Sequence, residues 1–205
     1  MKTVQEIARE IVAREGNRYT NDPDDSGGPT RNGVTIGRMI AMHLDLNGDG
    51  RVTAEDVRLV TPAMAERIFI DEYYTANRLH LLPEPLQASV FDMTVNAGSA
   101  GVRILQKLLN GYGAHLTTDG AMGPKTADAA HDVIGRVQNP GLVDAYGIAR
   151  RDFYYALADA RAKDRKYARR NDGGKGGWIR RAEEFISPAL HLTEAQHRAR
   201  VAAWT

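Results

Sequence analysis

The chain of 205 residues contains no cysteine, so it has neither a disulfide framework nor a thiol nucleophile. Its net charge of +1 at pH 7 argues against nucleic-acid binding over the whole surface. No apolar run approaches the roughly 18 residues that indicate a membrane span, and the N-terminus resembles a charged helix more than a signal peptide. With 42% hydrophobic residues the chain can still bury a core, so we expect a compact folded protein.

Two kinds of hydrolytic site are also missing from the sequence. The histidines do not form the His-Glu-x-x-His motif of zinc hydrolases, which weakens a metallo-amidase interpretation. No Gly-x-Ser-x-Gly motif is present, so a serine nucleophile on a strand-to-helix turn is not indicated. The chemistry must therefore come from other residues, and carboxylates are the next candidates. The six histidines are His43, His80, His115, His131, His191 and His197.

An amphipathic helix is predicted over about residues 3–15. Thr3 and Glu6 have the spacing of a capping box, and one apolar face is formed by Val4, Ile7, Ala8, Ile11 and Val12. Glu15 follows this face by three and four residues, so we expect its side chain to project from the apolar side. Desolvation and the negative end of the helix dipole would then favour the protonated carboxyl, which is the form that a general acid needs.

The polar loop after this helix supplies candidate partners for Glu15. Glycoside cleavage pairs a protonated carboxyl with a second carboxylate that stays ionised, and Asp24 and Asp25 are the natural choices. Gly27 and Gly28 allow a sharp turn, and an extended segment follows, so we expect a small β-hairpin near residues 18–37. Thr30 would then face the active-site cleft. An ordinary surface turn with a solvated Glu15 is the alternative.

Spacing and surrounding motifs give these residues a family resemblance. The order Glu15, Asp24, Thr30 has the Glu-eight-Asp-five-Thr spacing of the lysozymes of T-even phages. The segments 15–19, 25–30 and 33–35 resemble the motifs of glycoside hydrolase family 108, a family of phage endolysins and secretion-associated N-acetylmuramidases. An extra residue before Tyr19 shifts the motif, so the family pattern selects Asp25 where the bare spacing selects Asp24. The resemblance implies catalytic roles for Glu15, for one of these aspartates and for Thr30, and a substrate contact for Tyr19.

The resemblance continues through the second half of the chain. The segments 91–98, 105–109 and 119–126 are similar to the family's peptidoglycan-binding region, and Gly177-Trp178-Ile179-Arg180-Arg181 is similar to its Gly-Trp-x-x-Arg ending. Asn96 beside Gly98 offers an amide for a sugar hydroxyl or N-acetyl group, although Asn and Gly also end helices. Trp178 could stack on a sugar, but burial in the core is the expected fate. The basic run at 161–170 is either a solvated helix face or an attraction for anionic cell-wall groups.

A separate motif predicts a calcium loop of the EF-hand or dockerin type at residues 45–56. Oxygen ligands occupy the required positions, namely Asp45, Asn47, Asp49, the carbonyl of Arg51 and Asp56, with the turn glycine at position six. The last position carries Asp in place of the usual Glu, which favours weaker binding. A polar turn without metal is the alternative. We expect Ca²⁺ to have a structural role and to stabilise the lobe that carries the catalytic residues.

These patterns together predict a mainly α, lysozyme-like α+β fold, a helical bundle with one small β-hairpin at the active-site cleft. We expect a catalytic lobe at 1–80 and a helical lobe with the peptidoglycan-binding region at 81–205, packed as one compact unit. The expected helices lie at 3–15, 62–78, 84–96, 100–110, 124–136, 141–170 and 178–186, with another after residue 193.

The expected function is that of an endolysin-type N-acetylmuramidase, which cleaves the β-1,4 bond between N-acetylmuramic acid and N-acetylglucosamine. A non-catalytic, calcium-stabilised peptidoglycan-binding module and a lytic transglycosylase, which can use a single Glu, are the alternatives. The expected partner is bacterial peptidoglycan, with no nucleic acid and no membrane span, and the expected state is a monomer. We expect synthesis in the cytoplasm without a Sec signal, and action on the cell wall of the periplasm after holin-type or other non-Sec release.

Overall fold

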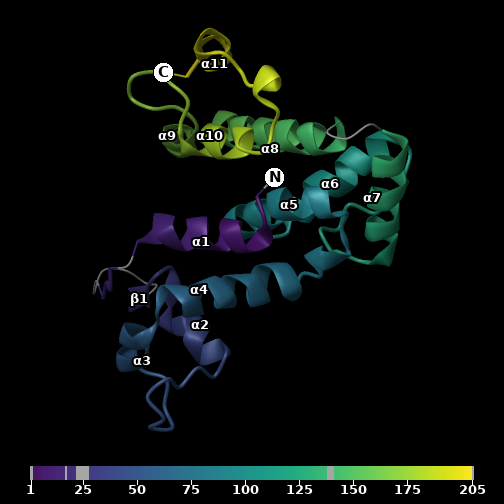
Figure 1. Cartoon of the computed structure of the whole chain (residues 1–205). Helices are drawn as coiled ribbons and strands as arrows, with labels where there is room; N and C mark the ends of the chain where they lie inside the picture. The colour runs from purple at the N-terminus through teal and green to yellow at the C-terminus, as the bar shows by residue number, and fades with distance from the viewer. Residues whose placement is uncertain (1, 17, 22–27, 138–140, 205) are drawn as a thin grey trace. The chain divides into compact units, whose positions relative to one another are not determined.

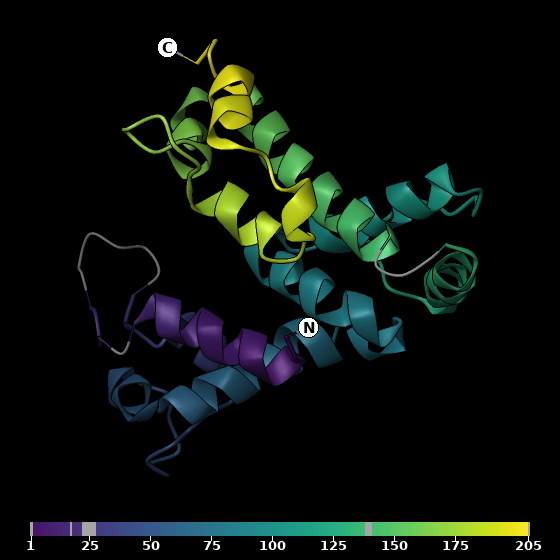
Figure 2. The same cartoon turned by 45° about the horizontal axis from the view of Figure 1, so that its top comes forward.

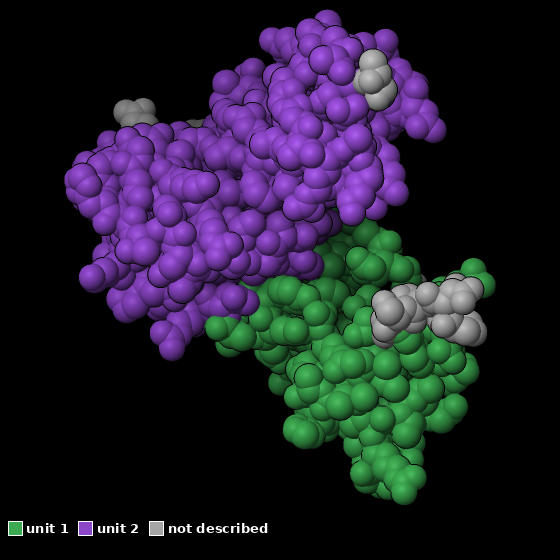
Figure 3. Space-filling view, turned by 180° about the vertical axis from the view of Figure 1, so that it is seen from behind, with its two compact units in different colours: residues 1–76 green, residues 77–205 purple. Residues whose placement is uncertain are grey.

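The computed structural model describes residues 2–16, 18–21, 28–137 and 141–204 (Figure 1). The chain divides into two compact units, residues 1–76 and 77–205, which Figure 3 shows in separate colours. The sequence places the boundary between its two lobes after residue 80. The described residues are mainly helical with one two-stranded antiparallel hairpin, which confirms the predicted fold class.

Unit 1 is built around the pair of helices α1 and α4, which pack against each other (Figure 2). Helix α1 begins with the predicted capping box, because Glu6 donates its backbone N–H to Thr3 Oγ1 at 3.2 Å and accepts from the backbone N–H of Thr3 at 2.7 Å. Its buried residues are the predicted apolar ones from Ile7 to Val12. The elements are α1 (Val4–Glu15), β1 (Thr30–Arg31), β2 (Val34–Thr35), α2 (Ile36–Ala41), α3 (Ala54–Leu59), α4 (Pro62–Phe69) and the π-helix η1 (Ile70–Thr75).

The hairpin is shorter than the predicted span of 18–37. Strands β1 and β2 pair antiparallel, and Asn32 and Gly33 between them have φ values of 53° and 78°. Two positive φ angles are typical of the type I′ turn, for which Asn-Gly is a preferred sequence. Asn32 is buried, and its Nδ2 donates to the carbonyl oxygen of Val60 at 2.9 Å, which attaches the turn to the segment before α4. The chain enters α2 directly after β2, so the expected strand beyond Thr35 is replaced by a helix.

Unit 2 is arranged around the long helix α8, which packs against α5, α6 and α10 (Figure 2). The core includes Phe91 on α5, Leu105 on α6 and Tyr146 on α8, each fully buried. No helix within the described residues is both long enough and apolar enough to cross a membrane. The elements are η2 (Leu79–Leu81), α5 (Glu84–Ala97), α6 (Ala100–Gly111), α7 (Pro124–Arg136), α8 (Gly141–Ala160), η3 (Ala162–Asp164), α9 (Arg165–Ala168), α10 (Gly177–Glu183), η4 (Pro188–Leu190) and α11 (Glu194–Arg200).

Two of the predicted helices are too long. The helix expected at 62–78 ends as an α-helix at Phe69 and continues as the π-helix η1. The helix expected at 141–170 ends at Ala160, where Arg161 is extended, and the short helices η3 and α9 follow before Arg169 pairs with Lys175 in an antiparallel bridge. Neither break is marked by proline or glycine, so the local sequence carries no stop signal at these positions.

Candidate active site

Glu15 is the last residue of α1, and its side chain lies against the turn of the hairpin. A Cβ atom at Gly33 would lie 2.8 Å from Cγ of Glu15 and 3.1 Å from Cζ of Phe69, closer than side-chain carbons approach one another. Gly33 also has a φ of 78°, which disfavours any residue with a side chain. The absence of a side chain at Gly33 therefore lets the turn approach the stem of Glu15, so that α1, the hairpin and α4 meet at one glutamate.

The expected burial of Glu15 is wrong, because the residue is exposed. The buried positions of α1 end with Val12, one turn earlier. The carbon stem of Glu15 lies against Gly33, whereas the residue as a whole remains accessible, as is common for long polar side chains beside apolar surface. The apolar face of the helix therefore positions the stem of Glu15 without enclosing the residue.

The loop between Thr20 and Thr30 is closed at its base by a pair of backbone hydrogen bonds. Thr20 and Thr30 each donate their N–H to the other's carbonyl oxygen at 2.9 Å. Thr30 Oγ1 donates to the carbonyl oxygen of Gly28 at 3.1 Å, so this hydroxyl stabilises the end of the loop. The predicted partners Asp24 and Asp25 belong to this loop and lie outside the described residues. The loop that carries them is thus tied to the hairpin whose turn contacts Glu15.

A cluster of polar and aromatic side chains on α2, α4 and η1 was not predicted from the sequence. The ring of Phe69, which lies beside Gly33, stacks on Tyr73 with 5.7 Å between ring centres. Arg38 donates to the hydroxyl of Tyr73, and its Nε lies 2.8 Å from Oε2 of Glu72. The π-helix places Glu72 and Tyr73 toward Arg38, and π-helical turns are frequent at functional sites. No sequence signal distinguishes this turn from an ordinary helix.

Tyr19, a predicted substrate contact, packs its ring against the guanidinium of Arg58. The guanidinium carbon of Arg58 is 3.9 Å from the centre of the Tyr19 ring, a cation–π contact. The Tyr19 hydroxyl is buried and has no hydrogen-bond partner among the residues that the structure describes.

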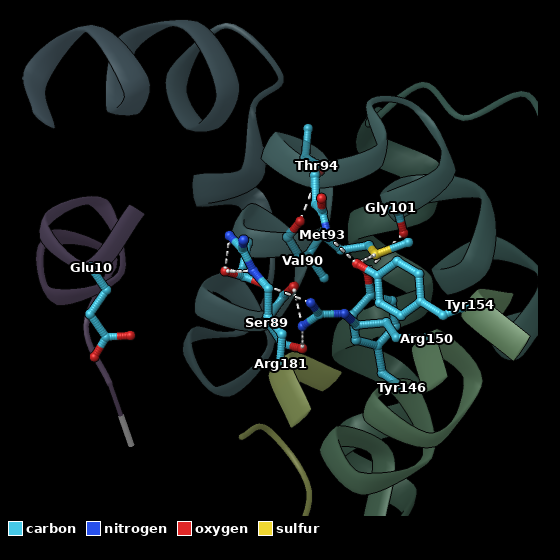
Figure 4. Close-up of polar contacts among 12 residues, drawn as sticks. Glu10, Ser89, Val90, Met93, Thr94, Gly101, Tyr146, Arg150, Tyr154 and Arg181 are labelled. Carbon is cyan, nitrogen blue, oxygen red and sulfur yellow. Dashed lines mark hydrogen bonds and ion pairs between the residues drawn. The ribbon is translucent and has the colours of Figure 1, made fainter. Parts of the chain in front are cut away.

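Asn96, the other predicted substrate contact, belongs to unit 2. It is exposed near the end of α5, and its Nδ2 donates to the hydroxyl of Tyr154 on α8. The Tyr154 hydroxyl in turn donates to Sδ of Met93 at 3.2 Å (Figure 4). Asn96 therefore holds the end of α5 to α8. Tyr19 belongs to unit 1 and Asn96 to unit 2, so the two predicted substrate contacts do not lie in the same unit.

The family motifs of the second half meet at a buried ion cluster. Asp92, from the segment 91–98, accepts from Arg150 at 2.6 Å and from Arg181, of the Gly-Trp-x-x-Arg ending, at 2.9 Å. Arg150 also donates to the carbonyl and hydroxyl oxygens of Ser89 (Figure 4). Burial alone would raise the pKa of Asp92, but the charges and hydrogen bonds of Arg150 and Arg181 outweigh burial and lower that pKa. These motif residues hold α5, α8 and α10 together.

Another pair of motifs meets at Gln106 on α6. Its Nε2 donates to Oδ1 of Asp119 at 2.8 Å and to Oγ1 of Thr126 at 3.3 Å, and its Oε1 accepts from the backbone N–H of Gly120 at 2.9 Å. Gly120 has a φ of 80°, and a side chain there would collide with the carbonyl oxygen of Ser99. These bonds give the Asp-Gly turn and the start of α7 an architectural role.

The predicted calcium loop closes on its own hydrogen bonds. Asp56 accepts from the backbone N–H groups of Leu46, Asn47 and Thr53 at 2.9, 3.1 and 2.7 Å, and the Thr53 bond is the largest cause of a lowered pKa for Asp56. Asp45 accepts from two further backbone N–H groups of the loop. Within the described parts of the chain, no three His, Asp or Glu side chains are grouped so that they could hold a metal ion. The sequence spacing of an EF-hand is present, but the carboxylates are turned to the backbone.

The mainly helical fold, with a glutamate at the end of α1 packed on a hairpin turn, has the architecture of the lysozyme-like glycoside hydrolases. Comparison of the sequence with family models gives the same class. Residues 8–98 match the model described as Glycosyl hydrolase 108, and residues 100–183 match the one described as Predicted Peptidoglycan domain. The segment 8–98 is therefore a glycoside hydrolase family 108 domain, and the protein is a peptidoglycan hydrolase, an N-acetylmuramidase.

Comparison with other proteins supports the fold. A solved structure of SagA from Brucella abortus matches with a TM-score of 0.58, covers 98% of this chain and 94% of that chain, and is 20% identical in sequence. At this level of identity the likeness concerns the fold alone. No curated protein matches the chain.

Proposed function

We propose that Glu15 is the general acid of this N-acetylmuramidase and donates its proton to the glycosidic oxygen as the bond to N-acetylmuramic acid breaks. The observation that carries the proposal is the close approach of Gly33, in the hairpin turn, to the stem of Glu15. This approach limits the positions that the stem of Glu15, and with it the carboxyl, can take beside the hairpin. A catalytic group must be held in this way, because an error of about 1 Å in its position can cost about 100-fold in rate.

The second carboxylate of the proposed mechanism is Asp24 or Asp25. The pair Thr20 and Thr30 supports this assignment, because it attaches the loop that contains both aspartates to the hairpin beside Glu15. The ionised aspartate would activate water or stabilise the positive charge that develops on the sugar ring. Replacing each aspartate separately by Asn should abolish turnover for one position only, and the assay is the release of soluble fragments from purified peptidoglycan.

Stereochemistry reports the geometry of the carboxyl pair. A separation of about 6.5–9.5 Å accommodates a water molecule and inverts the anomeric centre, whereas about 5–5.5 Å permits a covalent intermediate and retention. NMR of the first-formed anomer therefore measures which of the two arrangements Glu15 and its partner adopt.

Product identification tests the reaction class. Purified peptidoglycan is digested with wild type and with Glu15→Gln, and the fragments are identified by mass spectrometry. New reducing ends on N-acetylmuramic acid, from wild type alone, are the expected result. Anhydro-muramic ends would instead identify a lytic transglycosylase, and binding without cleavage by the wild type would identify a binding module.

We propose that the loop at 45–56 binds Ca²⁺ after its side chains rearrange. The proposal is supported by the spacing of Asp45, Asn47, Asp49 and Asp56, and the rearrangement is needed because Asp45 and Asp56 accept backbone hydrogen bonds in the structure. Ca²⁺ in excess should raise the melting temperature above its value in chelator, and Asp49→Ala should reduce the difference. Identical melts would exclude a structural calcium site and leave the hydrolase assignment unchanged.

Two further expectations remain predictions with direct tests. A monomer should elute as a single species of 22.5 kDa in light-scattering chromatography. A role in phage-type lysis requires release to the cell wall by a holin, so co-expression with a holin should trigger lysis of the host, whereas expression of either protein alone should not.

A further inference from the structure

Three aromatic rings of unit 2 form a stack that runs from the core to the surface. Trp178 at the start of α10 stacks between Tyr154 and Tyr167, with 5.0 Å between ring centres on each side and interplanar angles of 23° and 28°. Tyr154 is 1% exposed, whereas Tyr167 on α9 is 45% exposed. The inner ring is fixed by burial and by Asn96, so the outer ring is held in place and remains accessible. The expected burial of Trp178 is therefore only partial.

A basic pocket adjoins the outer ring of this stack. Its volume is about 460 Å³, and it is lined by Lys166, Arg169, Arg170, Asn171 and Asp172. Nζ of Lys166 is 5.0 Å from the centre of the Tyr167 ring, which connects the pocket to the aromatic stack. Three cationic side chains and one carboxylate leave the lining with a net positive charge.

Hydrogen bonds within the turn after α9 explain why this positive charge persists. Asp172 accepts from the backbone N–H of Gly174 at 2.9 Å and from the guanidinium of Arg170, so the one carboxylate of the lining is used within the turn. Arg169 donates to the backbone carbonyl of Trp204 at 2.6 Å, and a neutral carbonyl does not cancel its charge. Lys166 is exposed. The charges of Lys166 and Arg169 therefore face a ligand without a neutralising carboxylate from the lining.

We propose that Tyr167, Trp178 and the basic pocket form a peptidoglycan-binding site on unit 2, with a sugar ring on the exposed surface of Tyr167, in place of the Lys166 ammonium, and a carboxylate of the stem peptide in the pocket. Sugar rings pack their apolar faces on aromatic rings, and Arg and Lys bind carboxylates through charge-assisted hydrogen bonds. Peptidoglycan carries both groups close together. The site lies within the segment that matches the Predicted Peptidoglycan domain, and the proposal rests on the peptidoglycan substrate of the proposed function.

The test measures binding to purified, insoluble peptidoglycan by co-sedimentation. The full chain carrying Glu15→Gln is the parent, so that the polymer stays intact, and Tyr167→Ala and Lys166→Ala are added separately. Each should weaken binding about tenfold, because the ring loses its stacking surface and the pocket loses a charge. Tyr112→Ala is the matched control, because Tyr112 is 38% exposed on the same unit and takes no part in the stack.

Two results would overturn the site. One is an unchanged affinity in both Tyr167→Ala and Lys166→Ala, and the other is binding of the parent to vesicles of anionic phospholipid as tight as to peptidoglycan. If the proposed function were wrong, the result would differ. The parent would then not bind peptidoglycan, and the wild-type chain would release no fragments from it. The dependence of affinity on salt concentration is a further readout. Lys166→Ala should make the affinity for peptidoglycan less sensitive to salt, whereas Tyr167→Ala should leave the salt sensitivity unchanged.

Discussion

The substitution Gly33→Ala is expected to lower turnover much more than it lowers stability. The added methyl group would lie 2.8 Å from Cγ of Glu15, whereas ordinary contacts between such atoms begin at 3.4 Å. Either the Glu15 stem or the hairpin turn must therefore move by about 0.6 Å. Cζ of Phe69 would lie 3.1 Å from the same methyl group, so the ring restricts the movement of the turn. The carboxyl that we propose as the general acid shifts with its stem.

The magnitude follows from two separate costs. A residue with a side chain at a φ of 78° loses about 1–2 kcal/mol of stability in the left-handed region. A displacement of about 1 Å of a catalytic group costs about 100-fold in rate, so a shift of about 0.6 Å should reduce turnover by roughly 10- to 100-fold. The loss of rate thus exceeds what a loss of stability in a folded protein would cause.

The assay compares Gly33→Ala with Gly48→Ala. Gly48 has a φ of 77°, and a side chain there meets nothing within 4 Å, so this variant has the backbone cost without the collision. Urea unfolding should show that Gly33→Ala loses at least as much stability as Gly48→Ala while both remain folded, whereas release of fragments from peptidoglycan, measured in chelator, should fall only for Gly33→Ala. Equal turnover of the two folded variants would refute the positioning of Glu15 by the turn.

Other predictions concern unit 2. Asp92→Asn should cost about 3–5 kcal/mol in urea unfolding, because Arg150 would be buried without its counter-charge; wild-type stability in this variant would contradict the structure. Because burial is outweighed by Arg150 and Arg181, the pKa of Asp92 is lower in the folded than in the unfolded state. The stabilisation that ionised Asp92 gives the folded state is therefore complete above about pH 4 and is lost as the pH falls through the folded pKa. Asp92→Asn should accordingly make the free energy of unfolding depend less on pH in acid. Gln106→Ala should cost about 1–3 kcal/mol, because it leaves the N–H of Gly120 and the hydroxyl of Thr126 without their partner; a change below about 0.5 kcal/mol would argue against this role.

Local signals in the sequence predicted the elements that depend on local interactions. The capping box of Thr3 and Glu6 and the apolar face of α1 need only neighbouring residues, and the structure contains both. The class of the fold and the family followed from motifs whose order is specific. The buried ion cluster explains part of that specificity, since Asp92 and Arg181 are 89 positions apart and bind each other.

Features that depend on tertiary contacts could not be predicted from the sequence. The π-helix that directs Tyr73 to Arg38 has no sequence signal, and neither has the break between α8, which ends at Ala160, and the short elements η3 and α9. The exposure of Glu15 is another example. The helical period placed its stem on the apolar side correctly, but only the position of Gly33 shows that the turn meets the stem and leaves the residue accessible.

The central claim is that Glu15 is the general acid, and the most direct measurement compares Glu15→Gln with Glu10→Gln in peptidoglycan cleavage. Both glutamates lie on α1, and Glu10 makes a half-exposed ion pair with Lys2, so its loss should have little effect on stability or rate. We predict that Glu15→Gln loses at least about 100-fold in turnover at unchanged stability, whereas Glu10→Gln retains wild-type activity. Wild-type turnover by folded Glu15→Gln would contradict the account.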